Sequence, residues 1–144
     1  LRPTIRTREL IMPRVHGRHT SISLDGTVIS SISNNTSYGR TAKAHETTTY
    51  GLDDERHEGG LKGGKTTVNG FYESGATGPA DVVEPLLGTT VEFIFMPEGV
   101  GAGKPSRTGD VLVVSYNESV PVGDYITWSA ELQHSGPMVT GVQA

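Results

Sequence analysis

The sequence predicts an all-β domain with one short helix. Its 144 residues include 19 glycines and 8 prolines, which favours many turns between short strands. Several segments alternate apolar with polar residues or are rich in β-branched and aromatic residues, and only one stretch resembles a helix. A chain of this length builds one core more readily than two. We therefore expect one antiparallel β-sandwich or barrel-like domain.

The first element expected after the N-terminal segment is a β-hairpin. Residues 19–24 (HTSISL) alternate polar with apolar side chains, and residues 27–32 (TVISSI) form a second β-prone run. Asp25 and Gly26 between them are a turn pair that joins two antiparallel strands.

A long loop is expected over residues 33–64. Residues 33–43 are polar without a pattern, and residues 51–64 are charged and glycine-rich. Only residues 44–50 (AHETTTY) interrupt them as a possible strand, and the next strand is expected at 65–72. Long ordered loops in compact domains are usually functional, so this loop is a candidate contact surface for a partner.

One short helix is expected over residues 81–88 (DVVEPLLG), with Asp81 as its N-cap and Gly88 as its stop. Proline is tolerated only near the start of a helix, so Pro85 limits this helix to one or two turns.

Three strands are expected in the last third of the chain. Residues 90–96 (TVEFIFM) place apolar side chains on one face, and residues 110–116 are apolar on both faces, which indicates a central strand. Residues 98–109 between them are expected to be a flexible connection. Residues 125–132 (YITWSAEL) alternate strictly enough to predict one buried face and one solvated face. The predicted core residues are Phe93, Phe95, Ile126, Trp128 and Leu132.

Charge divides the chain into a basic arm and an acidic body. Residues 1–18 hold five arginines and one glutamate, whereas the rest holds seven basic and fifteen acidic residues. We expect an N-terminal arm (1–18) and a domain (19–144) that carries the long loop. Such an arm suits docking on the acidic surface of a neighbouring copy, folding on its own body, or binding nucleic acid. The contact candidates are Arg2, Arg6, Arg8, Arg14, Arg18, Asp53, Asp54, Glu55 and Glu58.

Composition excludes several classes of site. The absence of cysteine excludes disulfides, thiolate metal sites and cysteine nucleophiles. No run reaches the roughly 18 apolar residues that a membrane helix needs, and residues 1–10 (LRPTIRTREL) lack the apolar region of a signal peptide. We expect a protein that is made in a cytoplasm, that is used there or in a particle assembled there, and that does not bind membranes.

Residues 59–66 (GGLKGGKT) satisfy the phosphate-binding pattern G-x-x-x-x-G-K-[ST], but their context argues against a nucleotide site. The charged residues 53–58 precede the motif where a buried strand is needed, and a β-prone run follows it where a helix is needed. His57 and Glu58 with the nearby aspartates would bind a metal only if the loop curled around it. The five histidines show no catalytic spacing, so neither an enzyme nor a cofactor is indicated.

Several segments, taken in order, resemble the major tail tube protein family of long-tailed bacteriophages. The resemblance covers about residues 20–136, and it places the apparent phosphate-binding motif at a loop-to-strand junction of that family. The segments are 24–30 (LDGTVIS), 46–51 (ETTTYG), 60–72 (GLKGGKTTVNGFY), 120–124 (VPVGD), 128–133 (WSAELQ) and 135–136 (SG).

This resemblance implies a structural virion protein of the phage tail: a β-sandwich with a flanking helix that forms stacked hexameric rings around a conduit for DNA. Extended arms and the long loop, 33–64, join one ring to the next. The implied partners are further copies of itself, the tape measure protein, the tail terminator and tail tip proteins, and DNA in transient, non-specific passage. An acidic wall would let DNA slide, so Glu92 and Glu131 are candidates for lining the bore.

Two alternatives remain open at this stage. One is a different virion component with a small β fold, such as a tail terminator, a baseplate hub or a capsid decoration protein. The other is a carbohydrate-binding or enzymatic β-sandwich, which a ligand-induced shift in melting temperature would reveal.

Overall fold

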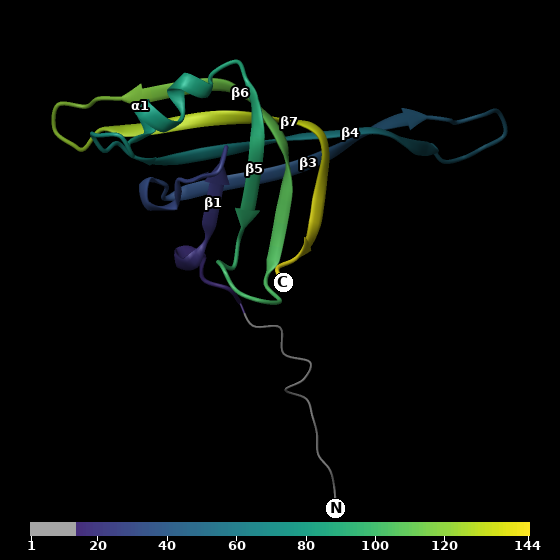
Figure 1. Cartoon of the computed structure of the whole chain (residues 1–144). Helices are drawn as coiled ribbons and strands as arrows, with labels where there is room; N and C mark the ends of the chain where they lie inside the picture. The colour runs from purple at the N-terminus through teal and green to yellow at the C-terminus, as the bar shows by residue number, and fades with distance from the viewer. Residues whose placement is uncertain (1–13) are drawn as a thin grey trace, which may run out of the picture.

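Residues 14–144 are described by a computed structural model, in which seven strands form one antiparallel sheet (Figure 1). The strand order is β2-β1-β5-β6-β7-β4-β3. This architecture confirms an all-β class with one short helix, α1 (Pro79–Val82). The strands are β1 (Ser21–Leu24), β2 (Thr27–Val28), β3 (Asn35–Glu46), β4 (His57–Phe71), β5 (Thr90–Met96), β6 (Pro105–Ser119) and β7 (Thr127–Val142), and the short 3₁₀ turns are η2 (Gly17–His19), η3 (Ser30–Ile32) and η4 (Glu84–Leu86).

The sheet folds over on itself and so makes the two layers of a sandwich. β6, β7 and β4 separate β5 from β3 in the hydrogen-bonding order, yet Tyr38 of β3 stacks on Phe95 of β5 with ring centroids 5.6 Å apart. Figure 1 shows β5 crossing the direction of β3 and β4. The pairing of β6 with β7 shifts register after Gly109 and again after Val113, and such bulges bend a strand.

The core lies between these layers, and four of the five predicted core residues are in it. Phe93, Leu132 and Trp128 are at most 2% exposed and Phe95 is 8% exposed. The fifth prediction, Ile126, is wrong: this side chain is only partly buried and lies outside the core cluster. Ile126 precedes β7 in a loop, so the alternation that holds along the strand does not extend to it.

The predicted first hairpin is present, although its second strand is short. Asp25 (φ 53°) and Gly26 (φ 80°) both have positive φ, as a two-residue hairpin turn of the I′ type requires. β2 ends at Val28, and the chain then turns inward through η3. Ile29 and Ile32 are thereby buried in the core.

The predicted long loop at 33–64 is wrong, because most of it is a long β-hairpin. β3 pairs with β4 from Asn35 opposite Asn69 to Glu46 opposite His57, and only residues 47–56 remain as a loop. The strand expected at 44–50 is correct only for residues 44–46, which end β3, and residues 47–50 lie in the loop. The outer part of this hairpin is exposed on both faces, and a strand without a buried face has no alternating pattern to find.

The helix lies close to its predicted place but starts earlier. α1 begins at Pro79 after the N-cap Gly78, so Asp81 is not the N-cap but lies in the first turn. Proline suits this position because its missing N–H is unpaired in any helix. η4 follows directly, and Gly88 (φ 81°) lies just beyond it.

The predicted bounds of β5 and the central position of β6 are confirmed, whereas the predicted start of β6 is wrong. β5 spans Thr90–Met96 as predicted, and β6 is the middle strand of the seven. β6 begins at Pro105, however, so the connection expected at 98–109 is shorter than predicted.

Candidate interaction surfaces

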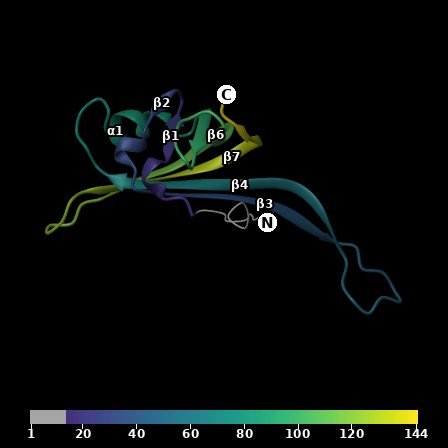
Figure 2. The same ribbon diagram turned by 90° about the horizontal axis from the view of Figure 1, so that it is seen from below.

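The β3–β4 hairpin projects from the body of the domain (Figures 1 and 2). No residue from Thr41 to Lys62 is buried. Tyr50 at its tip is fully exposed, and Leu61 is 80% exposed. A two-stranded hairpin without a core of its own is only marginally stable in water. This segment therefore has the properties of a surface that becomes buried against a partner.

The hairpin tip is closed by its own hydrogen bonds and carries the predicted acidic residues. The amide of Thr47 donates to the carbonyl oxygen of Arg56 (2.8 Å), and the amide of Arg56 donates to Oγ1 of Thr48 (2.9 Å). Glu55 lies 3.6 Å from Nε2 of His57. The structure thus brings Asp53, Asp54 and Glu55 into one exposed loop, with Glu58 on the adjoining start of β4.

A buried polar cluster anchors the base of this hairpin, and no motif in the sequence predicts it. His134 of β7 is 7% exposed. Its Nε2 lies 2.7 Å from Oγ1 of Thr66, and its Nδ1 lies 3.3 Å from Nη1 of Arg40. Burial and the nearby Arg40 charge lower the pKa of His134. The sequence around His134 contains no motif that would single it out, because its partners Arg40 and Thr66 lie far away in the sequence, on β3 and β4.

An aromatic stack extends the cluster toward β6. The Tyr38 ring lies between His134 (5.2 Å between centroids) and Phe95, and the Arg107 guanidinium lies 5.2 Å from the centroid of Tyr38. A guanidinium over an aromatic face is attracted by the ring quadrupole. Side chains from β3, β5, β6 and β7 are therefore joined at the point where the hairpin leaves the body.

The face of the sheet opposite the core is mostly polar, with Leu112 and Ile94 as apolar members, and both predicted bore residues lie on it. Glu92 is aligned with Asp110 across β5 and β6, and Glu131 is aligned with Thr67 across β7 and β4. Lys65, on the same face, lies 3.2 Å from Glu131 through its Nζ. Thr90 is aligned with Leu112 of β6, and Leu112 is aligned with Gln133 of β7. Residues two apart on a strand point to the same face, so Glu92 shares the face of Thr90 and Glu131 shares the face of Gln133. The two glutamates therefore lie on the same face of the sheet. We call it the outer sheet face; other members are Ser37, Asn69, Ser115, Asn117 and Ser129.

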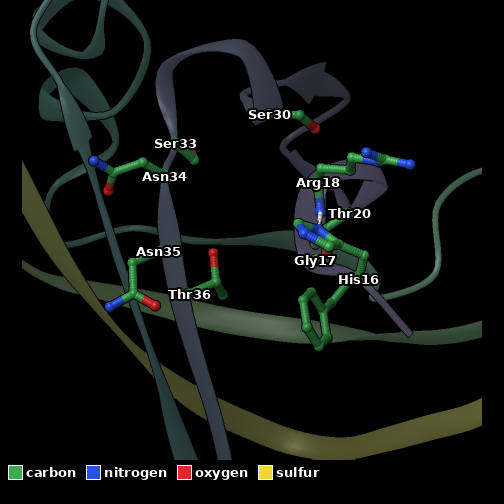
Figure 3. A pocket seen from close by; sticks show the side chains of 10 residues that line it. His16, Gly17, Arg18, Thr20, Ser30, Ser33, Asn34, Asn35 and Thr36 are labelled. Atoms are coloured by element: carbon green, nitrogen blue, oxygen red, sulfur yellow. Dashed lines mark hydrogen bonds between the residues drawn. The ribbon is translucent and has the colours of Figure 1, made fainter. Parts of the chain in front are cut away.

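A polar cavity of about 510 Å³ lies beside η2 (Figure 3). Arg18 and His16 line it from the η2 side, and Asn34, Asn35 and Thr36 line it from the start of β3. No acidic residue is among its lining residues. Of the predicted arm contacts, Arg14 and Arg18 are exposed, whereas Arg2, Arg6 and Arg8 lie outside the described residues.

Apolar side chains gather at the end of β4 and in the connection between β6 and β7, and this connection lies at the end of the molecule opposite the hairpin tip (Figure 1). Phe71 and Tyr125 meet edge to face with centroids 6.4 Å apart, and Ile126 lines the same open pocket. Val122 is fully exposed and Tyr125 is 79% exposed. The domain therefore has chemically different ends, one apolar and one acidic.

Neither a phosphate-binding motif in its usual structural context nor a cluster of metal ligands occurs within residues 14–144. Residues 59–66 lie inside β4, so the strand–loop–helix arrangement of a phosphate site does not occur there. No group of three or more potential ligands is placed to hold a metal ion in this part of the chain. None of the helices in the same range has the length and apolarity to cross a membrane.

The fold is similar to that of several phage-tail-like particles. A chain of the native gene transfer agent (GTA) virion superimposes with a TM-score of 0.73 at 13% identity, covering 90% of this chain and 100% of that chain. A chain from the tail of the empty GTA particle, which has C6 symmetry, superimposes with a TM-score of 0.71 at 15% identity, covering 91% of this chain and 100% of that chain. The SPP1 tail tube protein superimposes with a TM-score of 0.73 at 11% identity, covering 90% of this chain and 80% of that chain.

The same fold also occurs where such tubes end. A chain of the PVC sheath/tube terminator in its extended state gives a TM-score of 0.71 at 11% identity, covering 92% of this chain and 99% of that chain. No protein-family model and no curated protein sequence matches this chain. At such low identities the comparisons establish the class of fold: residues 14–144 have the tail tube fold.

Proposed function

We propose that this chain is a major tail tube subunit, a structural and non-enzymatic virion protein that assembles into stacked hexameric rings. The observation that carries this proposal is the projecting hairpin. Its outer strand segments, residues 41–46 and 57–62, pair with each other, and neither they nor the loop between them contains a buried residue. Burial against a neighbouring copy would supply the missing stabilisation. The fold shared with the C6-symmetric GTA tail and the SPP1 tail tube supports six-fold rings.

The outer sheet face lines the channel in this proposal. DNA slides along a wall that offers no counterion-release free energy, so acidic and neutral polar side chains suit it. Glu92 and Asp110 are directly opposed across two strands, and like charges so placed destabilise an isolated sheet. Lys65 is the one basic residue named on the outer sheet face, and it is paired with Glu131.

The remaining surfaces join subunits. The arm (1–18) and the hairpin contact neighbouring rings, and the tape measure, terminator and tail tip proteins meet the tube inside and at its ends. The protein is proposed to reside in the phage tail after assembly in the host cytoplasm, and DNA is proposed to pass through it without specific binding. Removing residues 1–14 is expected to prevent tube formation.

Negative-stain microscopy of the concentrated, purified protein tests the assembly directly. Hollow tubes of constant diameter and variable length are expected. The second candidate, a tail terminator, is favoured by the fold shared with the PVC sheath/tube terminator, and it would stop at single rings. Monomers under every assembly condition, together with a melting temperature raised by an oligosaccharide, would instead support a carbohydrate-binding domain.

A further inference from the structure

We propose that the acidic hairpin tip of one copy docks into the polar cavity beside η2 of the next copy. This proposal rests on the proposed function, because it needs copies that stack in one direction. It adds the acceptor for the hairpin and the chemistry of the contact. The donor residues are Asp53 and Asp54, and the acceptor residue that carries charge is Arg18.

The cavity has the chemistry of a carboxylate acceptor. Arg18 brings a permanent positive charge at the η2 side of the cavity, and Asn34, Asn35 and Thr36 bring neutral hydrogen-bonding groups on the opposite side (Figure 3). Only two ion pairs occur within residues 14–144, and neither uses Arg18. Its Nε contacts Nε2 of His19 at 3.3 Å, which leaves the two terminal nitrogens for a carboxylate. Guanidinium and carboxylate form a paired, charge-assisted contact.

The tip has the complementary chemistry. Asp53 and Asp54 are exposed, and neither takes part in the ion pairs of the described chain. Glu55 differs, because it is paired with His57. Tyr50 is also fully exposed on the same loop, while Phe95 supplies an apolar wall to the cavity. The tip therefore offers two unpaired carboxylates and an aromatic ring to a cavity that can take both.

The two sites are too far apart to meet within one molecule. Thr36 borders the cavity at the start of β3, and Glu46 lies next to the tip at the end of the same strand. Ten residues of β-strand span about 33 Å. Because the tip and the cavity lie at opposite ends of one extended strand, the tip of one copy can reach only the cavity of another copy. Such a head-to-tail contact repeats along a stack.

A charge exchange tests the pairing. Arg18→Glu alone, and Asp53→Lys with Asp54→Lys, are each expected to reduce the tube fraction recovered by sedimentation at least tenfold. The chain that carries all three substitutions is expected to recover most of that fraction, because each carboxylate again meets a cation. Unchanged melting, followed by circular dichroism, confirms that each variant is folded.

Lys104→Glu is the matched control, because Lys104 is exposed but does not line the cavity. Combining it with the two aspartate substitutions is expected to give no recovery. The docking proposal is overturned if the aspartate substitutions fail to rescue Arg18→Glu, or if Lys104→Glu restores tube formation to the aspartate variant as well as Arg18→Glu does. Failure of the unmodified protein to form tubes would overturn the proposed function instead, so the two failures are distinguishable.

Discussion

Nε2 of His134 lies 2.7 Å from Oγ1 of Thr66 and donates a hydrogen bond to it. The direction follows from the other ring nitrogen. Nδ1 of His134 lies 3.3 Å from Nη1 of Arg40, and a guanidinium can only donate, so Nδ1 must accept and the proton of the neutral ring resides on Nε2. The neutral imidazole thus ties β7 to both strands of the hairpin.

This arrangement makes the stability of the fold depend on pH near the histidine range. Burial and Arg40 lower the folded-state pKa of His134 below the unfolded value of about 6.5. As pH falls through about 6.5, the unfolded chain takes up the proton first, so the contribution of His134 is full above that pH and is lost below it. The slope is at most about 1.4 kcal/mol per pH unit.

Urea denaturation between pH 5 and pH 8 measures this effect. His134→Gln, which cannot titrate, is expected to show a flatter dependence than the unmodified protein. His45→Gln is the matched control, because His45 is exposed on the hairpin, and it should leave the dependence unchanged. Equal slopes for the unmodified protein and His134→Gln would refute the assignment.

Gly64 and Gly63 provide a second test at the base of the hairpin. A Cβ at Gly64 would collide with the carbonyl oxygen of Gly39 and would lie 3.0 Å from Cα of Arg40, whereas a Cβ at Gly63 would meet nothing within 4 Å. Gly64→Ala is expected to destabilise the protein by about 1–3 kcal/mol, because β3 must move. Gly63→Ala should be neutral or stabilising by up to about 1 kcal/mol. Denaturant melts that place both variants at the same stability would contradict this packing.

These contacts show where sequence reasoning succeeds and where it stops. The bounds of β5 were predicted because Phe93 and Phe95 face the core while Glu92 faces solvent, which gives a strand of period two. The outer hairpin has no buried face and hence no period. The motif at residues 59–66 lies inside β4, and the packing role of Gly64 and Thr66 depends on His134, about 70 positions away, which no local pattern reveals.

The outer sheet face was predicted in part from the sequence, whereas the polar cavity was not. Alternation around Glu131 predicted its solvated face, and pairing through β7, β6 and β5 adds that Glu92 shares that face. No local pattern carries this information, because it depends on the strand order. The polar cavity could not be predicted from the sequence either, since Arg18 and Asn34 line one cavity only after β1 and η3 reverse the chain.

Trp128 is expected to be the most sensitive aromatic residue of the core. Its Nε1 donates to the carbonyl oxygen of Ile32 at 3.0 Å in a buried contact. Trp128→Phe would leave that carbonyl without a partner, at a cost of about 1–3 kcal/mol. Tyr116→Phe is the control, because the Tyr116 hydroxyl donates to Glu118 at 2.6 Å in an exposed contact, and it should cost about 0.5 kcal/mol. Urea melts followed by circular dichroism compare the two, and similar losses would show that the indole hydrogen bond contributes little.

Reversing charge on the outer sheet face is expected to convert a permissive channel into one that retains DNA. Glu92 and Asp110 are aligned neighbours, so Glu92→Lys with Asp110→Lys repeats a pair of cations around every ring of the proposed tube. Each phosphate contact then releases counterions, and affinity falls steeply with added salt. Tubes of this variant should co-sediment with short duplex DNA in about 50 mM salt and lose it in about 200 mM. Asp81→Lys with Glu84→Lys makes the same charge change on α1 and η4, away from that face, and should retain far less DNA. Equal retention by both variants would mean that the outer sheet face does not line the channel.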